Sequence, residues 1–468
     1  MKKNTFSIIR TKRVQLCSYT IQCKKFYFIL LLTLSSSLLT IHAQSWHSLG
    51  TGLTDINNYS GEVYSIMPDS AAGLIYVGGN FSFAGGDSAY YLASWNGTQW
   101  DSVGKRLNNI VQAMTIYNDT LYVAGEFTMA DSLTVNYIAK WTGSKWDTVG
   151  YGFNSYVYTL TVLNGKLYAG GGFTKEDTMP TKHIAVWNGL KWDSVGNGFN
   201  DDVYWLTSWN DTLYAGGFFD SSGSLGVNHI AKWMGSKWGS LGSGMNSYVD
   251  GMLGYKGSLI ACGNFTSAGG TPVNYIAKWN GAKWDTLGAG MNNEVVALDT
   301  GKGLLYAGGY FNTAENITAN GIASWNGITW DSLASGVNGT VLALANYLGG
   351  IYAGGNFNTI MNDTVNSIAL WDTGKIVLGL PSVDNFSGNM NLYPNPNHGV
   401  FQLGIRNYKL GITNTVEVYN MLGEEIYSKQ LSIVNYPLSI DLSGSAPGLY
   451  LVKCYVGDKM FLKKVSVE

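Results

Sequence analysis

Short apolar runs separated by turn residues repeat along the middle of the chain. Residues 111–150 show one unit, in which 111–114, 121–125, 137–141 and 145–150 are rich in β-branched or aromatic side chains. Runs of this length between Gly, Asn and Asp predict strands rather than helices. Because short turns such as an Asn-Asp pair connect them, each unit is expected to form a four-stranded antiparallel sheet.

The unit recurs with a fixed period of 46 residues. One tryptophan in the third expected strand marks the register: Trp95, Trp141, Trp187, Trp233, Trp279, Trp325 and Trp371. Self-similarity at roughly 20 to 50 residues is typical of closed or stacked repeat architectures. Seven sheets that pack around an axis bury both of their faces, so the pattern predicts a seven-bladed β-propeller.

The two ends of the repeat region carry incomplete units that complement each other. Segment 46–50 is similar to the fourth strand at 100–104, yet it precedes the first complete unit. After Trp371 the corresponding tryptophan is replaced by Ile376. We expect the N-terminal segment to supply the fourth strand of the last sheet, which leaves no sheet edge open.

The turn between the third and fourth strands sets how their side chains meet. A two-residue turn at 96–97 (Asn-Gly) would place Trp95 diagonal to Trp100 on one face. The same register would bring Lys140 opposite Lys145, an unfavourable pair of like charges that is expected near the solvent-exposed rim.

Composition supports β structure and excludes several classes of partner. The 468 residues include 60 Gly, 30 Tyr and 16 Trp, and 13% are charged. Residues 1–43 hold seven Lys or Arg and no acid, so without them the formal charge moves from −2 to about −9. An acidic chain argues against nucleic acid as a partner. Cys262 and Cys454 are too few for a disulfide framework or a thiolate metal cluster, so we expect no metal and no cofactor.

The N-terminal 43 residues have the features of a secretory signal. Lys24 and Lys25 precede an apolar run at 26–41, and Ala43 is the small residue expected before a cleavage site. A membrane anchor is the alternative, but about 16 apolar residues interrupted by serines fall short of the roughly 20 that span a bilayer. We expect no integral membrane span after cleavage.

A binding surface is expected where the seven copies differ from one another. Each first strand starts at a fixed valine, from Val63 to Val341, and the residues on either side of this valine vary. These variable positions share a strand face and should ring one mouth of the central channel. Tyrosines mixed with carboxylates suit a sugar or a peptide, although they could also simply solvate the opening. The candidate ligand-binding residues, the mouth cluster, are Glu62, Tyr64, Tyr156, Tyr158, Asp202, Tyr204, Tyr248, Asp250 and Glu294.

No catalytic constellation stands out in the sequence. His183 and His229 occupy equivalent positions, but a third metal ligand is not evident. Cleavage of a glycosidic bond needs two carboxyls about 5 to 9.5 Å apart, and Asp202 and Glu294 are two units apart. We expect a binding or adhesion protein for extracellular glycan or protein, without catalytic residues. The alternative is an extracellular polysaccharide-acting enzyme with its site at the channel mouth.

The repeat unit has a Leu-Tyr-Ala-Gly-Gly strand at 167–171, the pair Trp187 and Trp192, and an acidic residue, Asp193. It resembles the kelch repeat and the propeller of galactose oxidase, over about 330 residues. The strict period and the use of Trp where Tyr is common depart from that pattern. The oxidase's copper site has no evident match here, so the resemblance implies a fold and no activity.

After an expected linker at 380–389, a different strand pattern begins. It predicts an immunoglobulin-like β-sandwich of about 80 residues. The expected strands are 415–419, 425–430, 438–442, 449–456 and 460–467.

Motifs in this segment point to an export signal. It opens with Tyr-Pro-Asn-Pro at 393–396 and closes with Gly-Leu-Tyr at 448–450. It resembles the type A sorting domain of the type IX secretion system of Bacteroidetes, which implies a domain read by that machinery. An ordinary immunoglobulin-like adhesion module is the alternative. The matching residues are Pro394, Asn395, Pro396, Gly399, Gly448, Tyr450, Lys463 and Lys464.

The sequence thus predicts an all-β protein in four parts: a signal peptide at 1–43, a seven-bladed β-propeller at 44–379, a linker at 380–389 and a sorting domain at 390–468. We expect an extracellular or cell-surface location. The expected partners are the type IX machinery and an extracellular glycan or protein.

Overall fold

The described residues form strands and no helix, which confirms the all-β prediction. The computed structural model describes residues 44–361, 363–372, 390–393, 395, 397–405, 414–420, 425–431, 438–456 and 459–467. The expected signal peptide and linker lie outside these residues. Across the described chain, a helix with the length and apolarity to cross a bilayer is not found. Residues 44–372 and 390–467 are treated separately below.

Residues 45–372 of the described chain form seven four-stranded antiparallel sheets, each a simple meander. The first strands are β3 (Glu62–Asp69), β9 (Val111–Tyr117), β15 (Val157–Leu163), β21 (Val203–Trp209), β27 (Val249–Tyr255), β33 (Val295–Gly301) and β39 (Thr340–Tyr347). The second strands are β4 (Leu74–Asn80), β10 (Thr120–Gly125), β16 (Lys166–Gly171), β22 (Thr212–Gly217), β28 (Ser258–Gly263), β34 (Leu304–Gly309) and β40 (Gly350–Asn356).

The outer half of each sheet is shorter. The third strands are β7 (Leu92–Trp95), β13 (Ile138–Trp141), β19 (Ile184–Trp187), β25 (Ile230–Trp233), β31 (Ile276–Trp279), β37 (Ile322–Trp325) and β43 (Ile368–Asp372). The fourth strands are β8 (Trp100–Ser102), β14 (Trp146–Thr148), β20 (Trp192–Ser194), β26 (Trp238–Ser240), β32 (Trp284–Thr286), β38 (Trp330–Ser332) and, in the last sheet, β1 (Ser45–Ser48).

Small ribbons connect the second and third strands. They are β11 (Met129–Ala130) with β12 (Leu133–Thr134), β17 (Lys175–Glu176) with β18 (Met179–Pro180), β23 (Ser221–Ser222) with β24 (Leu225–Gly226), β29 (Ser267–Ala268) with β30 (Thr271–Pro272), β35 (Thr313–Ala314) with β36 (Ile317–Thr318), and β41 (Thr359–Ile360) with β42 (Asp363–Thr364). In the first unit β2 (Leu53–Thr54) joins β5 (Phe83–Ala84) and β6 (Asp87–Ser88) in a three-stranded sheet.

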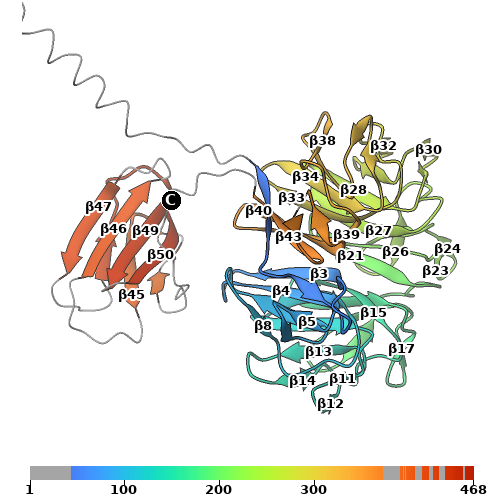
Figure 1. Ribbon diagram of the computed structural model, residues 1–468, viewed down its shortest axis with the longest axis horizontal. Coiled ribbons are helices and arrows are strands. Elements are labelled where there is room, and N and C mark those ends of the chain that lie inside the picture. Colours follow the sequence, from blue (N-terminus) through green and yellow to red (C-terminus); the bar gives the residue numbers. More distant parts are fainter. Residues whose placement is uncertain are drawn as a thin grey trace, which may run out of the picture. The chain divides into compact units, whose positions relative to one another are not determined.

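The first strands contact one another in a closed cycle, from β3 through β9, β15, β21, β27 and β33 to β39 and back to β3. They lie together in the middle of the repeat region in Figure 1. The last sheet has the order β1-β43-β40-β39, in which Trp46 pairs with Trp371. The prediction that the N-terminal segment completes the last sheet is therefore confirmed. Residues 45–372 have the repeated-sheet arrangement of a β-propeller.

Valines and glycines allow neighbouring sheets to pack closely. Val111 has no exposed surface, and a Cβ on Gly78 of the preceding sheet would lie 2.4 Å from its Cγ1. A Cβ on Gly354 would likewise lie 2.4 Å from Val63 Cγ1, so the first and last sheets pack in the same way. In the fifth sheet the glycine is replaced by Cys262, which is fully buried.

Six of the seven fourth-strand tryptophans hydrogen-bond to the preceding unit, whereas the buried indole N–H of Trp146 has no partner among the described residues. The indole N–H of Trp192 donates to the Val149 carbonyl at 3.1 Å, and that of Trp100 donates to the Leu49 carbonyl at 2.8 Å. Phe or Tyr could fill similar space, but neither has an N–H at this position. The repeated Trp thus contributes a hydrogen bond between units as well as apolar area.

The predicted register of the outer hairpin is wrong. Trp95 lies directly opposite Trp100, with ring centroids 5.1 Å apart. Asn96 Oδ1 accepts from the backbone N–H groups of Thr98 and Gln99, and the turn spans four residues, 96–99, instead of two. In the same register Lys140 lies opposite Asp147, not Lys145, and forms an ion pair at 3.4 Å. The expected repulsion is therefore replaced by an attraction.

The C-terminal residues form two sheets around one core. The strands β44 (Met390–Tyr393), β45 (Val400–Ile405) and β48 (Leu438–Asp441) make one sheet, and β47 (Glu425–Leu431), β46 (Asn414–Asn420), β49 (Gly448–Val456) and β50 (Lys459–Val467) make the other. Phe401, Val416 and Val452 are fully buried in this core. All five expected strands are present, and β44 and β45 add two that the sequence reading did not name.

Candidate functional site

Each first strand carries a β-bulge at its start. Val63 pairs with Gly79 and Ser65 with Gly78, so Tyr64 is the extra residue. A bulge bends the strand and re-aims a side chain. The same register shift occurs in all seven first strands, and the bulged residues are Tyr64, Gln112, Tyr158, Tyr204, Asp250, Val296 and Leu342.

Aromatic rings of the mouth cluster form a continuous chain of contacts. Tyr156 meets Tyr158 with ring centroids 6.3 Å apart, and Tyr158 meets Tyr204 at 5.6 Å. Tyr204 in turn meets Tyr248 at 6.0 Å. All three contacts are edge-on, the geometry that aromatic quadrupoles favour. The structure thus brings these four predicted residues together across three neighbouring sheets.

Glu62 and Tyr64 form a second part of the cluster. The Tyr64 hydroxyl donates to Glu62 Oε2 at 2.5 Å, and Asn356 Nδ2 donates to Glu62 Oε1 at 2.8 Å. Burial, and next the hydrogen bond to Glu62, raise the pKa of Tyr64 well above its usual range. Both carboxylate oxygens of Glu62 are therefore occupied by neutral donors from the protein itself.

Asp202 is held by a histidine that the sequence reading had considered as a metal ligand. His183 Nδ1 lies 3.4 Å from Asp202 Oδ1 and 3.1 Å from the Gly171 carbonyl. Two acceptors around one ring nitrogen indicate that Nδ1 carries a proton. Burial raises the pKa of Asp202, and His183 partly offsets this.

Asp250 and Glu294 come together from neighbouring sheets. Burial, and then the Glu294 charge and hydrogen bond, raise the pKa of Asp250 to about 9. Tyr248 also hydrogen-bonds to Glu294, and burial is the first cause of its raised pKa. At neutral pH Asp250 is therefore protonated, and its buried Oδ2 has no hydrogen-bond partner within the described chain. Sequence reasoning named both residues but not their contact.

A further ring of positions at this mouth was missed. In five of the seven sheets, the residue after the second strand donates its backbone N–H to the carbonyl of the residue before the fixed valine, as Phe218 does to Asp202 and Tyr310 to Glu294. Phe218 is 49% exposed and Tyr310 51%. Phe218 packs at 6.0 Å from Tyr248. Comparing the seven copies at this position would have found both residues.

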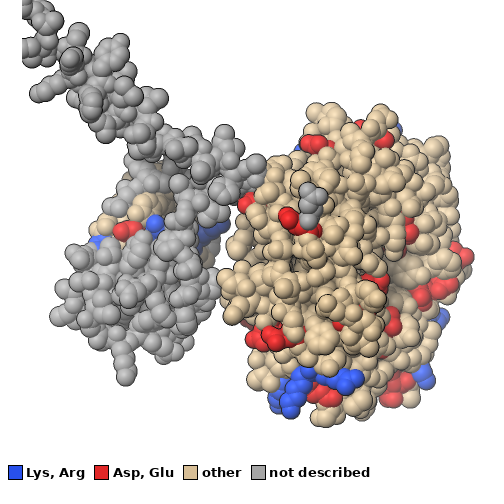
Figure 2. Space-filling model, viewed as in Figure 1, with Lys and Arg blue, Asp and Glu red and all other residues tan. Residues whose placement is uncertain are grey.

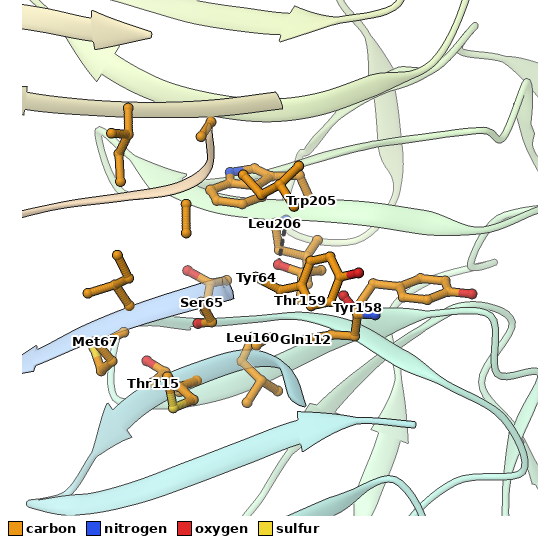
Figure 3. A pocket seen from close by; sticks show the side chains of 18 of the residues that line it. Tyr64, Ser65, Met67, Gln112, Thr115, Tyr158, Thr159, Leu160, Trp205 and Leu206 are labelled. Carbon is orange, nitrogen blue, oxygen red and sulfur yellow. Dashed lines mark hydrogen bonds between the residues drawn. The ribbon is translucent and has the colours of Figure 1, made fainter. Parts of the chain in front are cut away.

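A cavity of about 320 Å³ lies beside these groups. Its lining comes from β3, β9, β15, β21, β33 and β39, six of the seven first strands. Figure 3 shows Tyr64, Gln112 and Tyr158 toward one end, and Met67 and Thr115 toward the other. The cavity therefore runs along the centre of the cycle of first strands.

Neither the surface charge nor the placement of possible metal ligands indicates a second candidate site in the described part of the chain. Over the face in Figure 2, acidic and basic side chains form small separate groups on a mostly uncharged surface. Within the described ranges, three His, Cys, Asp or Glu side chains do not gather into a possible metal site.

The C-terminal motif residues have structural partners. Asn395 accepts from Ser466 N at 2.8 Å and donates to the Lys464 carbonyl at 3.1 Å. A Cβ on Gly399, which has φ of 93°, would lie 2.5 Å from Ser443 Cα. Pro394 and Pro396 lie outside the described residues.

Near the last two strands, the Tyr450 hydroxyl donates to the Ala446 carbonyl at 2.6 Å. Gly448 begins β49, while Lys463 and Lys464 lie in β50. These contacts give the motif residues described here a role in holding the domain's turns and strands.

Two family matches cover separate parts of the chain. Residues 391–468 match the family described as "Secretion system C-terminal sorting domain". The chain carries a C-terminal sorting domain for secretion. Residues 51–207 match the "Rax2 C-terminal beta propeller domain", which supports a propeller in the repeat region. The sorting domain implies interaction with type IX secretion machinery, export, and an extracellular or cell-surface location.

Other comparisons add little. No curated protein matches the chain. A solved structure titled "Structure of Dos1 propeller" is 10% identical, with a TM-score of 0.35, and covers 69% of this chain and 95% of that chain. A superposition this weak carries no argument. The resemblance to kelch repeats and the bacterial group stay predictions.

Proposed function

We propose that this protein is an exported binding protein, in which a seven-bladed β-propeller at 44–379 recognises an extracellular glycan or protein at its channel mouth. The closed cycle of first strands and the seven repeated sheets support the blade number. A signal peptide at 1–43 and an immunoglobulin-like sorting domain at 390–468 complete the proposal, with the linker at 380–389 between propeller and sorting domain.

The exposed aromatic surface at the mouth carries the proposal. Tyr156 is 39% exposed, Phe218 49% and Tyr310 51%. Large apolar side chains left partly in water beside buried polar groups mark interaction sites more often than structural cores. Tyr156 packs on Tyr158, which lines the cavity between the first strands, and Phe218 packs on Tyr248 of the same chain of rings. A ligand in the cavity opening could therefore cover this aromatic surface as well.

Hydrolysis is the weaker candidate. Asp250 is buried beside Glu294, and burial, followed by the Glu294 charge, raises its pKa to about 9. Glycoside hydrolysis needs a gap of about 5 to 9.5 Å between carboxyls, because a sugar or a water must fit between them. The other carboxylates of the mouth cluster, Glu62 and Asp202, are held by neighbouring side chains of the protein, which favours binding without bond cleavage.

A screen of the full secreted chain against immobilised glycans and surface proteins, with analysis of released products, tests this proposal. We expect retention of a ligand without products. Replacing Tyr156 and Tyr248 with Ala should reduce retention at least about tenfold, because two aromatic contacts are lost. The control is Leu190→Ala, since Leu190 is 87% exposed in the β19–β20 hairpin. Equal retention by the double variant, or released product, would refute the proposal.

A further inference from the structure

The cavity between the first strands has an uncharged, hydroxyl-rich lining. No Asp, Glu, Lys, Arg or His is among its lining residues. Hydroxyls come from Ser65, Thr115, Thr161 and Thr207, besides the two tyrosines at the mouth end. Ile66 and Leu344 add apolar surface. The carboxylates of the mouth cluster are therefore not part of the cavity lining.

One residue breaks the repeat pattern inside this cavity. Trp205 stands two positions after the fixed valine of β21, where the other six units have Ser65, Ala113, Thr159, Gly251, Ala297 and Ala343. Its indole N–H donates to the Met252 carbonyl of β27 at 2.9 Å, so the ring orientation is fixed. A large aromatic ring in place of a small side chain offers a flat packing surface in the lumen.

We propose that this cavity binds one uncharged sugar ring at the end of a glycan, packed against Trp205 and hydrogen-bonded by the threonine hydroxyls. This inference rests on the proposed binding function and deepens it by naming the ligand class. A sugar ring combines apolar C–H faces with hydroxyls that both donate and accept, which matches a lining of an indole, apolar side chains and hydroxyls.

Other ligands fit this lining less well. A lysine or arginine side chain would lose its hydration without gaining a carboxylate partner inside the cavity. An apolar peptide side chain would leave the threonine hydroxyls unpaired, which is costly. About 320 Å³ is at the small end of the roughly 300 to 1,000 Å³ typical of ligand sites. Because strands enclose the cavity on most sides, a polymer would enter by its end.

Calorimetric titration of the full chain with neutral tetrasaccharides of glucose, mannose and N-acetylglucosamine tests this inference. A tetralysine peptide and a tetra-alanine peptide serve as comparison probes. We expect one or more neutral sugars to bind. Trp205→Ala should weaken that binding at least about tenfold, and Thr161→Val by about two- to tenfold because one hydrogen bond is lost.

Two further variants keep the test interpretable if Trp205→Ala unfolds. Trp205→Phe retains a ring and should stay within about threefold of wild type. Trp209→Phe changes a tryptophan of the same strand that packs against Tyr214 outside the cavity lining, and it should leave binding unchanged.

The outcomes separate this inference from the proposed function. Ligand retention that the double Tyr156/Tyr248 variant reduces but Trp205→Ala and Thr161→Val do not would overturn the sugar inference and keep the binding function. Tighter binding of tetralysine than of the neutral tetrasaccharides would also overturn the sugar inference and keep the binding function. Failure of glycans, proteins and peptides alike to bind would overturn both.

Discussion

Single residues in this protein act mainly where two sheets meet. Asp299 is an example: its carboxylate accepts from the backbone N–H of Thr300 and from that of Asn346 in the next sheet. Burial nevertheless outweighs these bonds and raises the pKa of Asp299 to about 6. Asp299 therefore joins two units, but its burial lowers the free energy of unfolding by an amount that depends on pH.

The Asp299→Asn variant should show this cost. With a folded pKa above the unfolded one, Asp299 is protonated in both states below about pH 4, and its penalty grows as pH rises to 6, reaching at most about 3 kcal/mol. Asn carries no charge but keeps an acceptor for only one of the two N–H groups, because these bind different carboxylate oxygens. We expect its melting temperature, relative to that of wild type, to be higher at pH 7.5 than near pH 4. An identical difference at both pH values would contradict the assignment.

A second prediction at this scale concerns the tryptophan hydrogen bond between units. Trp192 is fully buried, so Trp192→Phe removes apolar contacts and leaves the Val149 carbonyl without its donor. We expect a loss of about 2 to 4 kcal/mol in the free energy of unfolding, measured by denaturant titration. Trp187→Phe in the same hairpin is the matched control, because within the described chain the indole N–H of Trp187 makes no hydrogen bond. Equal losses would mean that the hydrogen bond is unimportant.

At the scale of elements, sequence predicted the strands well and their register less well. The Asn118-Asp119 turn was expected and has φ of 49° and 56°, as a type I′ hairpin requires. At Asn96 the side chain bonds the backbone of the turn, and this shifted the pairing in a way that residue spacing does not reveal. The bulge after each fixed valine also has no sequence signature of its own.

The candidate site shows the same limit. The spacing of the copies placed the nine mouth residues at the starts of the first strands, because a repeat fixes equivalent positions in each sheet. It could not place Asp250 against Glu294, since that contact depends on how two sheets pack. It also missed Trp205 as a lining residue, because bulge geometry decides which side chains reach the lumen.

The N-terminal strand provides a prediction about elements. Deleting residues 44–49 removes β1, and with it the pairing of Trp46 with Trp371 and the indole bond to the Leu333 carbonyl. We expect a loss of at least about 3 kcal/mol in unfolding free energy, by analogy with removal of a large packed side chain. His47→Ala, an exposed change in the same strand, should alter stability by less than about 0.5 kcal/mol. A deletion variant as stable as wild type would show that ring closure does not need this strand.

On the scale of the whole molecule, the repeat region and the C-terminal domain have different roles. The repeat region carries the mouth cluster, and the sorting domain carries the export signal. Removing 391–468 should abolish delivery to the medium or cell surface in a host with type IX secretion. The reason is that the domain recognised by the secretion machinery is lost, while the repeat region stays intact. Cell fractionation with immunoblotting measures this. The same segment fused to a periplasmic reporter should redirect it, and export of the truncated chain would contradict the assignment.

The most direct test of the account is hydrogen–deuterium exchange of the full chain with and without the ligand found by screening. The proposed binding function predicts slower exchange at the starts of the first strands, around 62–65, 156–159, 202–205 and 248–251. Protection confined to the outer strands, the connecting ribbons or the C-terminal domain would contradict it.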